Sequence, residues 1–357
     1  MNKRMLAIVM AGAVSMGMLA GCSGSDKAAS TTTAAASTET QKTEAAAQTG
    51  GQKAEIVLKA GEPNPEGHLL TQAMEHFAEL AAEKSDGRIK VEVYPGGQLG
   101  DEATSMQSLQ MGGLDIYRGS AVNMYDYGAK KMNIFGLPYL FAGREHFWKV
   151  MKSDLGREIL DDLRASGTGI IGLGYLDEGA RNFFTKDPVT KPEDLKGKKL
   201  RVAETSTLMA TVDAFGASPT PISFSELYTS LQTGVVDGAE QPLPGYESNS
   251  FDEVAKYMVL DGHSYTPGLI VISEITWNKL SEEDQNILKE AASETEDWNR
   301  SSAETSEKEL MEKLTSQGAV ISEPDDITQW QDLVQPVYDE FAADYTDLIT
   351  EIRAMQE

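Results

Sequence analysis

The chain has 357 residues, of which 40% are hydrophobic and 24% are charged, a composition typical of a globular protein long enough for two domains. Its 31 Lys and Arg residues against 56 Asp and Glu residues give a formal net charge of −25, which argues against a diffuse basic surface for nucleic acid. A single cysteine excludes an intrachain disulfide framework and every metal site that needs several cysteines.

The first residues have the pattern of an export signal. Lys3 and Arg4 precede an apolar run at 5–20 that is short and rich in small residues, so it does not suit a membrane span. The run ends in the letters LAGC, the order of a bacterial lipoprotein signal. We therefore predict a signal peptide at 1–21 and a lipid on Cys22 that anchors the chain to the outer face of the cytoplasmic membrane. The alternative is a plain thiol after an ordinary secretory signal.

Residues 22–53 are predicted to be a flexible linker. They are mostly Ser, Thr, Ala, Gln and Gly, and they contain no aromatic residue. Such a segment cannot bury enough apolar surface to offset the chain entropy lost on folding.

Strand and helix patterns alternate along the rest of the chain. Two-residue apolar periodicity or short apolar runs predict strands, and recurrence every three to four residues predicts helices. The predicted strands are 54–60, 88–94, 114–117, 168–173 and 199–203, and the predicted helices are 68–84, 102–111 and 145–165. This alternation indicates an α/β fold with mostly parallel sheets.

One helix is predicted to be unusually long. Ser281 is a good N-cap, because three acidic residues follow it in what would be the first turn of the helix. No Gly or Pro interrupts the chain from there to Gln317. At 1.5 Å per residue such a helix is roughly 50 Å long, more than the width of one small domain. Its apolar positions keep no heptad, so it indicates a spine across two lobes rather than a coiled coil.

No catalytic or metal-binding constellation is recognisable. The four histidines show no metal-ligand spacing, and the sequence lacks HExxH, a nucleophile elbow and a phosphate-binding loop. Adjacent carboxylates on predicted helices are explained by solvated faces. We therefore expect a binding protein rather than an enzyme, with no cofactor and no metal.

Three arginines are candidate anion ligands. Arg201 lies inside an apolar strand, Arg181 follows a turn of small residues, and Arg118 ends a short strand. A buried guanidinium needs a partner, and its planar fork matches a carboxylate with two parallel hydrogen bonds. From composition alone, a salt bridge to one of the chain's 56 acids is a better explanation than a ligand.

Several segments resemble the solute-binding subunits of tripartite ATP-independent periplasmic (TRAP) transporters. These are YPGGQLGDE (94–102), GGLDI (112–116), LPYLF (137–141), KPEDLKGKKLRV (191–202), FGASPTPISFSELYTSLQTGVVDGAEQPL (215–243) and SEEDQ (281–285). The resemblance implies a two-lobed fold of the periplasmic-binding-protein type, with crossing strands and a long hinge-spanning helix. It places lobe I at 54–178 plus 267–306 and lobe II at 179–266 plus 307–357.

The same resemblance implies a function and a site. The chain is expected to capture an organic acid and deliver it to the membrane subunits of a TRAP transporter. Carried over onto this sequence, the ligand-binding residues are Arg201, Arg181, Arg118, Gln241, Phe224, Glu226 and Glu102. Arg201 would pair with the carboxylate, Phe224 would pack on the ligand, and Glu226 would hold a hydroxyl or brace an arginine.

Two positions bear on the ligand's identity. The family commonly has Asn where this chain has Gln241, so the pocket is reshaped there if that side chain contacts ligand. Arg118 resembles an extra arginine of members that bind sugar acids such as hexuronates, and the stretch after it disfavours sialic acid. The alternative ligands are a C4-dicarboxylate and a 2-oxo acid. The alternative roles are a sensory module, an ABC-type binding protein and, from a different class, an enzyme such as a lyase for uronates.

Overall fold

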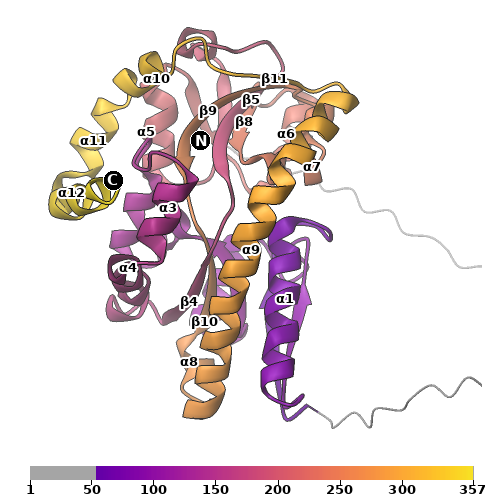
Figure 1. The fold of residues 1–357 in the computed structure, drawn as a ribbon. Helices are drawn as coiled ribbons and strands as arrows, with labels where there is room; N and C mark the ends of the chain where they lie inside the picture. The colour runs from indigo at the N-terminus through magenta and orange to yellow at the C-terminus, as the bar shows by residue number, and fades with distance from the viewer. Residues whose placement is uncertain (1–53, 357) are drawn as a thin grey trace, which may run out of the picture. The chain divides into compact units, whose positions relative to one another are not determined.

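The computed structural model describes residues 54–356. The predicted signal peptide, Cys22 and linker lie outside these residues. Two β-sheets with helices packed around them make up the described part of the chain (Figure 1). The α/β prediction is therefore confirmed.

The first sheet has five strands in the order β2-β1-β3-β10-β4. They are β1 (Ile56–Gly61), β2 (Ile89–Tyr94), β3 (Ile116–Ser120), β4 (Ile170–Leu176) and β10 (Gly268–Ser273). Both faces of β10 are buried, because Ile270 belongs to one core with Phe77 of α1 (Leu69–Lys84), whereas Leu269 belongs to another with Trp148. Burial on both faces explains why this strand is apolar throughout.

The second sheet has six strands in the order β11-β9-β5-β8-β6-β7. They are β5 (Ala180–Thr185), β6 (Lys199–Val202), β7 (Ser218–Pro221), β8 (Gly238–Gln241), β9 (Tyr257–Tyr265) and β11 (Val320–Ser322). Strands β6, β7 and β8 pair in parallel.

The two sheets exchange strands. The chain passes directly from β4 in the first sheet to β5 in the second, and it returns from β9 to β10. Strand β10 is antiparallel to β3 and β4, and β5 is antiparallel to β8 and β9. The prediction of mostly parallel sheets is therefore wrong for the crossing strands. Strands β4 and β5 lead from the first sheet to the second, and each lies antiparallel to a strand of the return connection, β10 or β9.

The long predicted helix is confirmed as α9 (Glu282–Gln317), and the Ser281 hydroxyl accepts a hydrogen bond from the backbone N–H of Asp284. Leu288, near its start, shares a core with α1 and the first sheet. Leu314, near its end, shares a core with Leu227 and the second sheet. The helix runs beside α1 and reaches α7 (Leu243–Ser248), so it connects both halves of the fold (Figure 1).

The single helix predicted for 145–165 is wrong, because two helices occupy this range, α3 (Arg144–Met151) and α4 (Asp154–Ala165). The Ser153 hydroxyl caps α4 by accepting a hydrogen bond from the N–H of Gly156. A side chain at Gly156 would clash with the last carbonyls of α3, since its Cβ would lie 2.4 Å from the Val150 oxygen. The apolar periodicity of the sequence continues across the break between α3 and α4, so the pattern predicts one helix where there are two.

Shorter helices complete the described chain. They are α2 (Glu102–Gln110), α5 (Ser206–Ala214), α6 (Leu227–Thr233), α8 (Glu274–Trp277), α10 (Ile327–Leu333), α11 (Gln335–Phe341) and α12 (Thr346–Ala354). The last three pack against both halves. Trp330 of α10 stacks near Phe183 of β5, whereas the Ile352 carbonyl of α12 lies 2.8 Å from Nε2 of His146 in α3. The lobe boundaries given above stay a prediction.

Candidate functional site

A cavity of about 660 Å³ lies between the two sheets, a size ordinary for a small-molecule site. The first half of the fold lines it with Asn64, His68, Glu102, Arg118 and Asn123, and the second half with Arg181, Arg201, Phe224 and Gln241. Glu178, in the crossing between β4 and β5, lines it as well. The structure thus brings together six of the seven ligand-binding residues predicted from the sequence.

Three buried arginines enter this cavity from three different strands. Arg118 is on β3, Arg181 on β5 and Arg201 on β6, and their exposed fractions are 5%, 7% and 4%. Each has apolar neighbours in its strand, as in the sequence Leu-Arg-Val around Arg201. The strand pairing of the two sheets therefore holds the guanidinium groups at fixed positions.

Arg118 is neutralised by the chain's own acids. Its Nε and Nη2 donate to the two carboxylate oxygens of Glu62 at 2.8 and 2.9 Å, and its Nη1 donates to Glu178 at 3.1 Å. Burial alone would lower the pKa of Arg118, but these carboxylates raise it above its ordinary value. Arg118 is thus part of an internal ion pair at the cavity wall.

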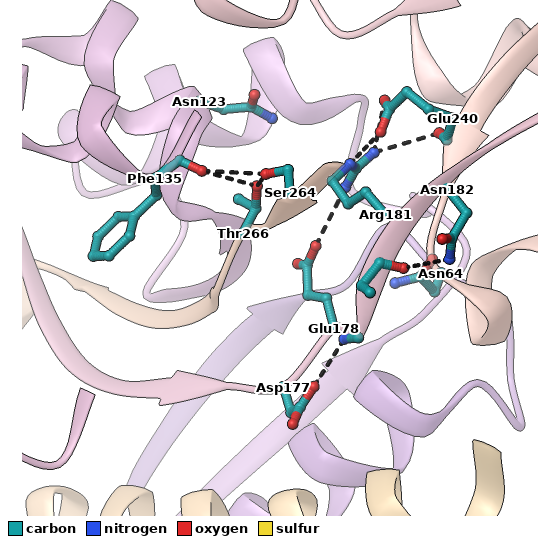
Figure 2. A network of polar contacts seen from close by, with 12 residues as sticks. Asn64, Asn123, Phe135, Asp177, Glu178, Arg181, Asn182, Glu240, Ser264 and Thr266 are labelled. Carbon is teal, nitrogen blue, oxygen red and sulfur yellow. Dashed lines mark hydrogen bonds and ion pairs between the residues drawn. The ribbon is translucent and has the colours of Figure 1, made fainter. Parts of the chain in front are cut away.

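Arg181 is neutralised in the same way (Figure 2). Its Nε and Nη2 donate to the carboxylate of Glu240, the second at 2.8 Å, and its Nη1 lies 3.6 Å from Glu178. Burial by itself raises the pKa of Glu240, but Arg181 and His263 hold it at about 2. The internal salt bridge considered for this arginine is therefore present.

His263 extends this network on the far side of Glu240. Its Nδ1 lies 2.7 Å from the Asp261 carboxylate and its Nε2 lies 3.7 Å from Glu240. Burial lowers the pKa of His263, but the two carboxylates outweigh this effect and raise it to about 9. The imidazole is therefore charged at neutral pH.

Arg201 differs from the other two arginines. Its Nε donates to the Ile222 carbonyl at 2.8 Å, and its guanidinium carbon lies 5.8 Å from the centre of the Phe224 ring. Within residues 54–356 no carboxylate oxygen lies within 4.0 Å of it. Burial lowers its pKa to about 10. Arg201 is thus a desolvated cation with two terminal nitrogens free to receive an anion.

Two carboxylates in the cavity wall are also perturbed. Glu178 lies between Arg118 and Arg181, yet burial raises its pKa to about 7. Glu102 has no arginine in contact, and its Oε2 accepts from Nδ2 of Asn123 at 2.6 Å. Burial raises the pKa of Glu102.

The remaining predicted positions have different surroundings. Gln241 is buried at the cavity, and a Cβ at Gly245 would lie 2.9 Å from its Oε1, so glycine leaves room for this longer amide. Glu226 is exposed, lies outside the cavity lining, and accepts a hydrogen bond from the Ser223 hydroxyl at 3.0 Å. Its predicted ligand contact stays a prediction.

Sequence reasoning missed the acids that neutralise the arginines, namely Glu62, Glu178 and Glu240. A signal was present, since Glu240 lies within a strand whose other residues are buried and Glu62 directly follows another strand. A charged residue in such a context needs a counter-charge. Which cation supplies it depends on the strand order.

Among residues 54–356 no group of three or more His, Cys, Asp or Glu side chains is placed to hold a metal ion. In that same part of the chain, every helix is too short or too polar to cross a membrane.

Comparison with known families gives one clear match. The model of the bacterial extracellular solute-binding proteins of family 7, called DctP, matches residues 60–344. The chain is similar to the sialic acid-binding periplasmic protein SiaP of Vibrio cholerae, at 33% identity over 81% of this chain and 89% of the relative. It is also similar to the C4-dicarboxylate-binding periplasmic protein DctP of Rhodobacter capsulatus, at 31% identity over 74% of this chain and 80% of the relative.

Solved structures agree with this match. A TRAP periplasmic solute-binding protein of Pseudomonas putida F1 with bound D-glucuronate is 30% identical, with a TM-score of 0.82 over 85% of this chain and 98% of the other. One from Xanthobacter autotrophicus Py2 with bound β-D-galacturonate is also 30% identical, with a TM-score of 0.80 over 83% and 99%. The two-lobed fold expected from the sequence is thereby confirmed.

Proposed function

The chain belongs to family 7 of the bacterial extracellular solute-binding proteins, the substrate-binding subunits of TRAP transporters, and from this we propose that it captures a sugar acid, such as a hexuronate, through Arg201 and delivers it to the transporter's membrane subunits. The family consists of binding components rather than enzymes and works outside the cytoplasm.

The unpaired state of Arg201 carries the proposal. Arg118 and Arg181 already have carboxylate partners, whereas Arg201 has none among residues 54–356. An uncompensated buried charge is costly, and a ligand carboxylate on the two free nitrogens of Arg201 would remove that cost with two charge-assisted hydrogen bonds. Phe224 would cover one side of the ligand, since its ring already lies beside this guanidinium.

The choice of a sugar acid rests on two observations. Solved relatives with TM-scores of about 0.8 hold glucuronate or galacturonate. The cavity also offers neutral polar groups beyond Arg201, including the Gln241 amide and Asn64, which suit hydroxyl groups. Because relatives named for C4-dicarboxylates are similarly close, a C4-dicarboxylate is the second candidate.

Capture would shift the equilibrium between open and closed lobes. A ligand that contacts Arg201 in one half and the opposite cavity wall in the other binds the closed form better, and only such differential affinity shifts a population. The crossing strands and α9 are the connections that would bend. The net charge of −25 repels anions at a distance, but physiological salt screens it over about 8 Å.

We propose as well that Cys22 carries the lipid that anchors the protein at the membrane. A sensory module that hands the ligand to a receptor is the alternative role, and co-purification with the TRAP membrane subunits would distinguish the two.

A thermal-shift panel tests the proposal. The purified protein, unfolded and refolded to remove any bound acid, would be heated with hexuronates, aldonates, C4-dicarboxylates, 2-oxo acids and sialic acid. A ligand at 100 times its Kd should add about 2.7 kcal/mol to the free energy of unfolding. We expect the largest rise in melting temperature with a hexuronate. A rise only with C4-dicarboxylates would replace the sugar-acid assignment, and no rise with any acid would contradict the proposal.

A further inference from the structure

A pair of unpartnered oxygens lies in the cavity wall on the side of the first sheet. Glu102 is the first residue of α2, and Asn123 lies in the 3₁₀ segment that follows β3. Their one mutual hydrogen bond uses the Asn123 Nδ2 and the Glu102 Oε2, at 2.6 Å. The Glu102 Oε1 and the Asn123 Oδ1 are enclosed and have no hydrogen-bond partner among the described residues. Two acceptors therefore lie in this wall without a donor.

Glu102 also differs from the three carboxylates that pair with the buried arginines, because among residues 54–356 no Lys, Arg or His nitrogen lies within 4.0 Å of it. Glu62, Glu178 and Glu240 each have an arginine nitrogen within 3.1 Å, whereas the partner of Glu102 is a neutral amide. An ionised carboxylate without a contacting cation is poorly stabilised once water is removed. Burial accordingly raises the pKa of Glu102, and it outweighs the opposing effects of Arg118, the Asn123 amide, Arg201 and the Ser120 backbone.

The groups that face Glu102 come from every element around it. They are Asp101 at the N-cap of its helix, His68 at the N-cap of α1, Tyr117 and Arg118 on β3, Asp126 and Tyr127 in the 3₁₀ segment, Arg201 on β6, Glu204 just after β6, and Glu178 in the strand crossing. Tyr127 is neutral, since burial raises its pKa to about 12. Apart from hydrogen bonding, the ionised form of Glu102 is therefore supported by two positive charges, that of Arg118, which Glu62 neutralises, and that of Arg201.

A bound acid would remove the second of these supports. Its carboxylate would neutralise Arg201 and add a negative charge to the same cavity, and both effects oppose an ionised Glu102. We propose that ligand capture is coupled to the uptake of one proton by Glu102, whose Oε1 then donates a hydrogen bond to a hydroxyl oxygen of the ligand. This inference rests on the proposed function and goes beyond it, because it makes the proton a second ligand of the same site.

Glu178 is the competing proton acceptor, since burial raises its pKa to about 7. It lies 3.1 Å from a nitrogen of Arg118 and 3.6 Å from one of Arg181, and neither arginine has to leave it when Arg201 binds an anion. Its counter-charges thus persist in the complex, whereas Glu102 loses one. This difference favours Glu102 over Glu178 as the group that takes up the proton.

Isothermal titration of the full-length protein with D-glucuronate measures the proton directly. Titrations in buffers of different ionisation enthalpy, at several pH values between about 5.5 and 8.5, give the number of protons taken up per ligand, and the ligand's own carboxyl group is ionised throughout this range. We expect uptake that approaches one proton, with Kd rising up to about tenfold per pH unit where uptake is complete.

Two variants identify the acceptor. Glu102→Gln keeps a similar shape and cannot titrate, so it should bind D-glucuronate without proton uptake and with a Kd independent of pH. Glu304→Gln, the same change at an exposed carboxylate of α9 outside the cavity lining, should leave proton uptake unchanged. Buffer-independent heat in the wild type, or uptake that persists in Glu102→Gln, overturns the inference. No binding heat in the wild type would instead reject hexuronate capture, and this inference with it.

Discussion

Replacing Arg201 with lysine is expected to weaken ligand binding sharply while leaving the fold intact. In the structure the Nε of Arg201 is held by the Ile222 carbonyl at 2.8 Å, and both terminal nitrogens are free to bind a carboxylate in parallel. A lysine keeps the charge but has one nitrogen, so it must share its donors between the Ile222 carbonyl and the ligand.

The magnitude follows from the hydrogen bonds lost. A charge-assisted hydrogen bond contributes about 1.5–3 kcal/mol, and the Ile222 carbonyl loses its donor or competes for the ammonium. The expected loss in binding free energy is therefore about 2–4 kcal/mol, or roughly 30- to 700-fold in Kd.

Isothermal titration with whichever acid gives the largest thermal shift measures this loss. Arg300→Lys is the matched control, because Arg300 is half-buried on α9 between Glu304 and the Trp148 ring and does not line the cavity, so the Kd of this variant should not change. The melting temperature without ligand separates binding from folding. An Arg201→Lys protein that binds with wild-type affinity would show that Arg201 is not the carboxylate ligand, and equal losses of stability and affinity would show a structural role.

Four other outcomes are expected. Arg201→Met should abolish the ligand-induced thermal shift yet leave the melting temperature of the ligand-free protein unchanged or higher. The reason is that it removes a desolvated charge that lacks a carboxylate partner in the described chain. A clearly lower melting temperature of the ligand-free variant would contradict this. The pKa of His263 is raised from 6.5 to about 9, so its contribution to the free energy of unfolding is complete below about pH 6.5 and is lost as pH rises through 9. Urea denaturation at a series of pH values measures this loss, which should disappear in His263→Gln. A pH profile that is the same in the variant and the wild type would refute the assignment. Glu226→Gln should change the Kd by less than about twofold, because Glu226 is exposed, lies outside the cavity lining and accepts a hydrogen bond from Ser223; a larger change would show that it contacts the ligand. Cys22→Ser should release the protein from the membrane fraction, and retention there would contradict the lipid anchor.

Local sequence patterns were enough to locate the long helix and to identify the family. Local apolar periodicity and the Ser281 cap located α9 to within one residue, because helix starts and uninterrupted propensity are local properties. The segments from 191 to 243 carried the resemblance that the family match confirms. The split between α3 and α4 was missed, because the Ser153 cap interrupts a helix without changing its apolar pattern.

The pairing of the buried charges, in contrast, depends on the arrangement of the two sheets in space. Arg118, Arg181 and Arg201 look alike in the sequence, each an arginine in or beside an apolar strand. The strand order places Glu240 beside Arg181 and Glu62 beside Arg118, while the same order leaves a carbonyl and an aromatic ring beside Arg201. Electrostatic pairing acts through space between residues far apart in the chain, so it is fixed by how the two sheets pair and cross.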